Sequence, residues 1–195
     1  RRPPRSTRKE SSAASDVYKR QDLNPLLVQA DPGKNLRYCK ERHINKVPDT
    51  LDEKIWLDIK KTIDPSKKNN FDYEIENTSR SVGTRLSHHI YKTYGNNKLP
   101  DDTINIKLTG SAGQSLGAFL TKGIKLTVEG DCNDYVGKGL SGGTIVVYPS
   151  TKNNLISNEN IIIGNTVLYG ATSGKLFASG QAGERFAVRN SGSLS

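Results

Sequence analysis

The sequence predicts a mainly β fold in which short strands coil as a solenoid, preceded by a small α/β arm. Two observations carry this prediction. Fifteen of the eighteen glycines lie in the last 95 residues, from Gly110 to Gly192. Because glycine is costly inside ordinary strands and helices, so dense a series indicates a backbone that turns sharply many times. Short apolar alternations separate these glycines at spacings of about 10 to 20 residues, which suits a stacked coil better than a sandwich.

Residues 1–21 are expected to be a disordered or foreign leader. Residues 1–20 hold seven basic and two acidic side chains, which supply +5 of the net charge of +9. The rest of the chain shows no basic face interleaved with aromatic residues, so we expect no nucleic-acid partner. No apolar run approaches the roughly 20 residues that span a bilayer, so no membrane partner is expected either. Because the chain contains no methionine, we interpret it as a fragment or a processed piece of a longer protein.

Residues 22–100 are predicted to form a linker followed by the α/β arm. A helix should begin at Leu51, because Thr50 and Glu53 have the spacing of a capping box, and it should end at Asp64-Pro65. Alternating apolar and acidic residues predict a half-exposed strand over residues 71–76. A second helix should follow and end at Gly95. The apolar residues of the two helices recur at helical spacing: Leu51, Ile55, Trp56, Ile59 and Ile63 in the first, and Val82, Leu86 and Ile90 in the second.

Residues 101–195 are predicted to form the glycine-rich β domain. Each expected strand is three to five residues long, and each is opened or closed by glycine. In a solenoid the inward side chains stack in rows while the corners need small or left-handed residues, which explains both features. The expected strands cover residues 104–108, 124–128, 145–147, 176–178 and 186–188.

The segment Gly137–Gly142 matches the dinucleotide-binding pattern GxGxxG. That pattern binds a pyrophosphate only where it follows a strand and opens a helix. Here the β-branched residues 144–148 follow, closed by Pro149, so we expect a strand and no nucleotide site. The overlapping segment Gly130–Lys138 imitates a phosphate-binding loop, but six residues instead of four separate its first two glycines, and Gly139 stands where a magnesium-binding hydroxyl is needed.

Other chemistry-bearing residues favour structural interpretations. Asp131 and Asp134 could serve as paired carboxylates or as ligands of a hard cation, but in a tight corner such side chains more often cap their own backbone amides. His88 and His89 point about 100 degrees apart on a helix and are expected on the surface. His43 stands alone. A salt-bridged outer face is the expected role of Glu184, Arg185 and Arg189.

The two cysteines, Cys39 and Cys132, are far apart and have no CxxC companion. They support neither a disulfide framework nor a metal site, and they fit a reducing, cytoplasmic compartment. Cys132 lacks a basic neighbour and is expected to be a small buried residue. The sequence therefore predicts no catalytic, cofactor-binding or metal-binding residue in this chain.

Five blocks of sequence together resemble the C-terminal domain of the large (alpha) subunit of glutamate synthases. The resemblance covers roughly residues 22–192. The blocks are residues 77–83, 110–119, 129–143, 161–174 and 182–192.

The resemblance implies a right-handed parallel β-helix, known as the GXGXG domain, in an enzyme that makes two glutamates from glutamine and 2-oxoglutarate. It places the glutaminase nucleophile, FMN and an iron-sulphur cluster in other domains, and position 132 is usually alanine in the family. The family's β-helix continues past Gly192, so we expect this chain to hold a β-helix truncated at its C-terminus, and alone to be marginally stable or prone to associate.

Three functional hypotheses follow. The first is a noncatalytic scaffold whose partners are the amidotransferase and synthase domains of the same large subunit, with a small electron-donating subunit or ferredoxin as a further partner. A second is a β-helix subunit of another oxidoreductase such as formylmethanofuran dehydrogenase. The third is a free-standing anion- or nucleotide-binding module, which depends on the GxGxxG letters alone. The α/β arm and the block at residues 77–83 favour the first.

Overall fold

The computed structural model describes residues 48–95, 99–150 and 154–195. The predicted leader at residues 1–21, nearly all of the linker, Cys39 and His43 lie outside the described residues. Within the described part, no helix has the length and apolar character needed to cross a membrane.

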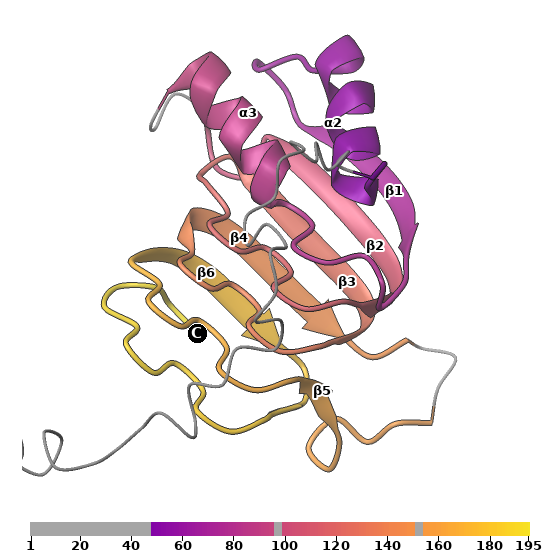
Figure 1. The fold of residues 1–195 in the computed structure, drawn as a ribbon, viewed down its shortest axis with the longest axis vertical. Helices are drawn as coiled ribbons and strands as arrows, with labels where there is room; N and C mark the ends of the chain where they lie inside the picture. Colours follow the sequence, from indigo (N-terminus) through magenta and orange to yellow (C-terminus); the bar gives the residue numbers. More distant parts are fainter. Residues whose placement is uncertain (1–47, 96–98, 151–153) are drawn as a thin grey trace, which may run out of the picture. The chain divides into compact units, whose positions relative to one another are not determined.

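The described residues form one parallel sheet of seven strands with two helices beside it (Figure 1). The main path of the sheet runs β1-β2-β3-β4-β6, while β5 pairs with β3 and β7. Each strand of the main path pairs in parallel with its neighbour. The strands are β1 (Asn69–Ile75), β2 (Ile104–Ala112), β3 (Ile124–Cys132), β4 (Ser141–Tyr148), β5 (Ile161–Ile163), β6 (Ser173–Ala178) and β7 (Gln181–Ala182).

The register of the strands places apolar residues in straight rows across the sheet. One row pairs Ile106 with Leu126, then Ile145, then Leu176. All four are at most 2% exposed. The next row has the same form, because side chains on alternate positions of a strand point to the same face. Its members are Leu108, Val128, Val147 and Ala178.

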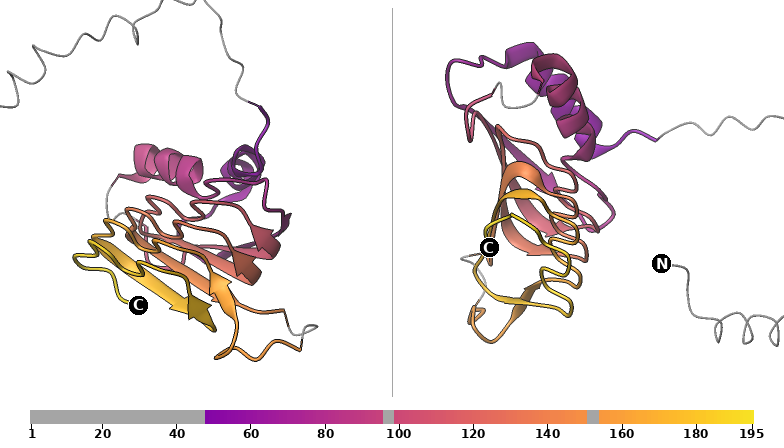
Figure 2. Two further views of the ribbon diagram at one scale, coloured as in Figure 1. Left: turned by 60° about the horizontal axis from the view of Figure 1, so that its bottom comes forward. Right: turned by 90° about the vertical axis from the view of Figure 1, so that its left-hand side faces the viewer.

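The segments that return the chain from one strand to the next are hydrogen-bonded turns stacked on one another (Figure 2). In the turn before β4, Tyr135, Gly137 and Gly139 all have positive φ, at 63°, 63° and 62°. The neighbouring turns repeat this left-handed backbone at every second residue. The equivalent residues are Ser115, Gly117 and Phe119 in the preceding turn, Thr166, Leu168 and Gly170 in the following turn, and Arg185, Ala187 and Arg189 in the last.

Two helices, α2 (Leu51–Thr62) and α3 (Thr84–Tyr94), pack side by side against the sheet (Figure 1). Their positions confirm both predicted helices, and the Thr50 hydroxyl caps α2 by accepting a hydrogen bond from the Glu53 amide at 3.2 Å. Helix α3 has no capping side chain of its own. Instead the buried carboxylate of Asp52 accepts hydrogen bonds from the amides of Gly83 (3.0 Å) and Arg85 (2.8 Å). Side chains of both helices and of the strands belong to one hydrophobic core.

The predicted fold class, a mainly β right-handed parallel β-helix truncated at its C-terminus, was wrong. The structure is an α/β arrangement of one parallel sheet with flanking helices. The physical reason is that the glycines do not simply mark corners between strands: Gly117, Gly137, Gly139 and Gly170 are left-handed residues within the return turns. Other glycines with positive φ lie inside strands, namely Gly110, Gly130, Gly142 and Gly174. The strand expected at residues 186–188 fails because Ala187 has a φ of 56° and sits in a turn.

The other expected strands are confirmed within β1, β2, β3, β4 and β6. The division at residue 100 stays a prediction. Strand β1, which lies before that division, pairs along its whole length with β2, which lies after it.

Candidate functional site

The GxGxxG letters at Gly137–Gly142 lie in the turn before β4 and in the first two residues of that strand. As predicted, a strand follows the motif and no helix begins. The amides that a phosphate would need are already bonded within the stack. Gly137 donates to the Leu116 carbonyl and Gly139 to the Tyr169 carbonyl, each at 2.9 Å. Two further amides of the motif, those of Leu140 and Ser141, donate to carbonyls at 3.0 Å.

A dinucleotide or flavin phosphate binds where several free amides point at it from a loop or a helix start. Four amides of this motif are already bonded, three to neighbouring turns and that of Leu140 to the Gly137 carbonyl in its own turn, so the segment does not fit a phosphate group. Lys138, the lysine of the phosphate-loop imitation, has its ammonium group 5.6 Å from the centre of the Tyr135 ring. We therefore derive no step through a nucleotide or a flavin at this segment.

The carboxylates of Asp131 and Asp134 accept hydrogen bonds from neighbouring segments of the stack and not from their own backbone amides. The Asp131 carboxylate accepts from the Ser111 hydroxyl at 2.6 Å, and that of Asp134 accepts from the Asn165 amide at 2.8 Å. Asn165 repeats the arrangement one turn later, where its side-chain oxygen accepts from the Glu184 amide at 2.8 Å. The expected local capping was therefore wrong for both aspartates: Asp131 joins β3 to β2, and Asp134 joins its turn to the next.

Cys132 lies at the end of β3 and is 5% exposed, as expected for a small buried residue. Burial raises the pKa of its thiol, and the charge of Asp131 adds to the effect, so the thiol stays protonated and unreactive at neutral pH. An iron-sulphur cluster needs several cysteine thiolates in one place. The described residues contain one cysteine and no group of three potential metal ligands, so they do not fit such a cluster.

The adjacent histidines have different surroundings. His88 is exposed, as expected, whereas the His89 ring stacks on Trp56 with centroids 4.5 Å apart and planes 3° from parallel. Burial against α2 is the largest cause that lowers the pKa of His89, and the neighbouring His88 lowers it further. The prediction of two surface histidines was thus wrong for His89, which is partly buried and stacks on Trp56 of the other helix.

The last turn does not form the salt-bridged face expected of Glu184, Arg185 and Arg189. None of the ion pairs among the described residues involves them. The guanidinium of Arg189 instead lies 5.9 Å from the centre of the Tyr169 ring, a cation–π contact between neighbouring turns.

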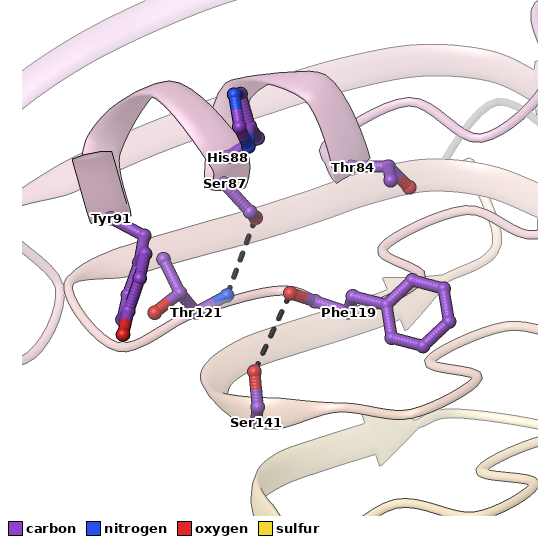
Figure 3. Close-up of a pocket in the computed structure, with 7 residues that line it drawn as sticks. All are labelled: Thr84, Ser87, His88, Tyr91, Phe119, Thr121 and Ser141. Carbon is purple, nitrogen blue, oxygen red and sulfur yellow. Dashed lines mark hydrogen bonds between the residues drawn. The ribbon is translucent and has the colours of Figure 1, made fainter. Parts of the chain in front are cut away.

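A hollow of about 260 Å³ lies between α3 and the return turns (Figure 3). Two hydroxyls in its wall are used internally: Ser87 accepts from the Thr121 amide at 3.3 Å, and Thr84 donates to the Ala118 carbonyl at 2.9 Å. Two aromatic side chains beside it, Tyr91 and Phe119, are 56% and 54% exposed. The residues that line the hollow are Thr84, Ser87, His88, Tyr91, Phe119, Thr121 and Ser141.

Sequence reasoning missed this hollow because its walls come from three separate segments. One signal could have pointed to it. Phe119 stands where the following turns have Gly139, Gly170 and Arg189, and all four residues are left-handed. A bulky aromatic residue at a position that favours glycine is an outlier that needs an explanation.

Comparison of the sequence with known proteins relates this chain to one family. The family described as "GXGXG motif" matches residues 52–195. The "Glutamate synthase [NADPH] large chain" of Azospirillum brasilense is 60% identical over 171 residues, which are 88% of this chain and 11% of that protein. The "Glutamate synthase [NADH]" of Saccharomyces cerevisiae is 48% identical over 174 residues, 88% of this chain and 8% of the relative.

A relative of a third kind is the "Ferredoxin-dependent glutamate synthase 2" of Synechocystis. It is 44% identical over 171 residues, 87% of this chain and 11% of the relative. This chain thus spans about a tenth of the length of the curated relatives that it matches.

Proposed function

The chain belongs to the GXGXG family, and we propose that it serves as the noncatalytic C-terminal scaffold domain of a glutamate synthase large chain. The whole enzyme would be an oxidoreductase that transfers the amide nitrogen of glutamine to 2-oxoglutarate and so assimilates ammonia nitrogen into glutamate. The observation that carries the proposal is the extent of the similarity. It covers 87% to 88% of this chain in relatives from three kinds of glutamate synthase.

The hydrogen bonds between the backbones of neighbouring turns suit a scaffold role. The turn amides bond from one turn to the next, as the Tyr135 amide does to the Asn165 carbonyl and the Thr166 amide to the Glu184 carbonyl. A surface built in this way is rigid, because moving one turn would break bonds to its neighbours on both sides. Such a surface would hold the amidotransferase and synthase domains so that ammonia passes between them without reaching solvent.

The proposal assigns cofactors and partners to the rest of the enzyme. FMN and an iron-sulphur cluster would lie in other domains, and the chain would contribute no ligand to either. Its partners would be the other domains of the same large chain, and the enzyme would receive electrons from a small subunit or from ferredoxin. We place the protein in the cytoplasm and treat the separation of residues 22–100 from residues 101–195 as part of the proposal.

The alternative of a subunit of another oxidoreductase, such as formylmethanofuran dehydrogenase, has less support. The similarity to glutamate synthases includes the helix-bearing residues before β2, and not only the glycine-rich repeats. The alternative of an anion-binding module is disfavoured by the bonded amides of Gly137 and Gly139.

A chimera tests the proposal. The matched segment of the Azospirillum brasilense large chain would be replaced by residues 52–195 of this chain, and a second variant would lack the segment. We expect the chimera to form two glutamates per glutamine, and the deletion variant to fail to assemble or to release ammonia. A deletion variant that assembles and keeps full coupling between glutamine consumption and glutamate formation would refute the scaffold role.

A further inference from the structure

Phe119 combines two energetic costs. Its backbone is left-handed, with a φ of 56°, a conformation that bulky residues avoid. Its ring is apolar, yet the residue remains 54% exposed. Strain of this kind persists where the surroundings impose it, and it concentrates at binding sites.

The neighbouring turn is shaped to accommodate the ring of Phe119. A side chain on Gly139 would begin 2.5 Å from that ring, so the glycine leaves the space in which the ring lies. The Phe119 amide donates to the Lys138 carbonyl at 2.8 Å, which fixes the backbone beneath the ring. The ring is thus held in place at the edge of the hollow (Figure 3).

The hollow has the size and chemistry to receive an apolar side chain. Its 260 Å³ exceed the roughly 150 Å³ of an apolar cavity that binds benzene. Its lining residues include one histidine, His88, but no carboxylate, lysine or arginine, so its wall offers little to hold a charged group. Tyr91 and Phe119 supply exposed aromatic walls, the residue type that most often anchors protein contacts.

The small size of the site indicates an occupant on the same polypeptide. A stable complex between separate proteins involves roughly 20–30 residues on each side, more than the seven that line the hollow. A tethered domain binds through smaller contacts because its effective concentration is in the range of millimolar. In the relatives, about nine-tenths of the chain lies outside the matched segment and could supply such a domain.

We propose that this hollow is a docking site for an apolar side chain from another domain of the same large chain, with Phe119 and Tyr91 as its anchors. The inference rests on the proposed scaffold function and names the surface through which the scaffold makes one of its contacts. It also makes a specific prediction: loss of the Phe119 ring should weaken docking between domains without impairing the folding of this domain.

Photo-crosslinking in the chimera described above tests the docking directly. Phe119 would be replaced by p-benzoylphenylalanine, and the matched control would carry the same replacement at Leu57, which is 47% exposed on α2. We expect position 119 to crosslink within the chain to a peptide of the amidotransferase or synthase domain, several-fold more than position 57. Crosslinks only between two copies, no crosslink, or equal yields at both positions would overturn the proposal.

The variant Phe119→Gly tests whether the ring serves docking or only packing. Glycine relieves the left-handed strain, so the isolated chain should unfold at the same or a higher temperature. In the chimera, however, ammonia released per glutamate formed should rise several-fold. A less stable isolated chain with unchanged coupling would mean that Phe119 is only a packing residue. A chimera that crosslinks as expected but forms no glutamate would refute the proposed function and leave the docking intact.

Discussion

The helix pair and the stack of strands and turns hold their neighbours together by different means. In the helix pair the contacts come from side chains: Asp52 caps the neighbouring helix, and Trp56 stacks on His89. In the stack they come largely from the backbone, whose amides bond from turn to turn. The helix pair should therefore be sensitive to the removal of side chains, and the stack to their addition.

The largest effect is expected from Gly130→Ala in the stack. A Cβ at position 130 would lie 2.0 Å from the Gly110 carbonyl oxygen, and the φ of 152° disfavours any side chain. The clash is with backbone, which cannot move without breaking the β2–β3 pairing. We expect a loss of about 3 kcal/mol or more in the free energy of unfolding, measured by urea denaturation.

Gly170→Ala is the matched control, because its φ of 68° is also left-handed but no atom lies within 4 Å of the added carbon. It should cost only the backbone strain, about 1–2 kcal/mol. If both variants lost the same free energy of unfolding, close packing between strands would not be the reason for glycine at position 130.

A loss of about 2–3 kcal/mol is expected from Asp52→Ala in the helix pair. The change leaves the amides of Gly83 and Arg85 without their acceptor at a largely buried helix start. Burial raises the pKa of Asp52, although the hydrogen bonds from backbone amides, that of Gly83 first, lower it. Chemical denaturation of Asp52→Ala beside Glu74→Ala, an exposed acid on β1, checks this, and similar small losses in both would contradict the capping.

A gain of about 0.5–1 kcal/mol is expected from Thr166→Gly. Thr166 is β-branched and has a φ of 58°, so glycine removes strain that exceeds its own entropic cost. The control Thr127→Gly in the middle of β3 should lose about 1 kcal/mol, because glycine weakens a regular strand. Thermal unfolding measures both changes, and the same sign in the two variants would mean that the turns are not strained.

A smaller, pH-dependent effect is expected from His89. Because its folded-state pKa lies below the usual value near 6.5, the folded chain binds fewer protons than the unfolded chain. The stability is therefore complete above about pH 6.5 and falls as the pH drops toward the lowered pKa. Glu53 opposes this shift, while Arg85 and Lys92 reinforce it. His89→Phe keeps a stacked ring and should flatten the decline in stability between pH 7 and pH 5. If the dependence of stability on pH were unchanged in this variant, other groups would cause the decline.

The elements that sequence reasoning predicted well are those decided by local chemistry. Thr50 caps α2 and Gly95 ends α3, and the alternation at Ile104–Leu108 forms a strand that faces the core. Phe186–Val188 shows the same alternation but forms a turn, because its neighbours Arg185 and Arg189 are left-handed. Composition did not reveal this, since neither residue is one that normally adopts a positive φ.

The candidate hollow escaped prediction for a different reason. Its walls unite Thr84 on α3, Phe119 in a turn and Ser141 at the start of β4, and only the register of the stack brings them together. The hydrogen bond that the Asn165 amide donates to the Asp134 carboxylate likewise depends on which turn lies next in the stack. Long-range register of this kind is not encoded in the local pattern of any one segment.

We conclude that the glycine-rich turns are architectural, because the amides of Gly137 and Gly139 bond to neighbouring turns. Hydrogen exchange at these two amides, with and without FMN, NADPH or inorganic phosphate, is the test. We expect exchange as slow as that of the amides paired between β2 and β3, with no change when any of the three compounds is added. Fast exchange that slows when one of these compounds is added would contradict the claim and revive the interpretation of the motif as a phosphate site.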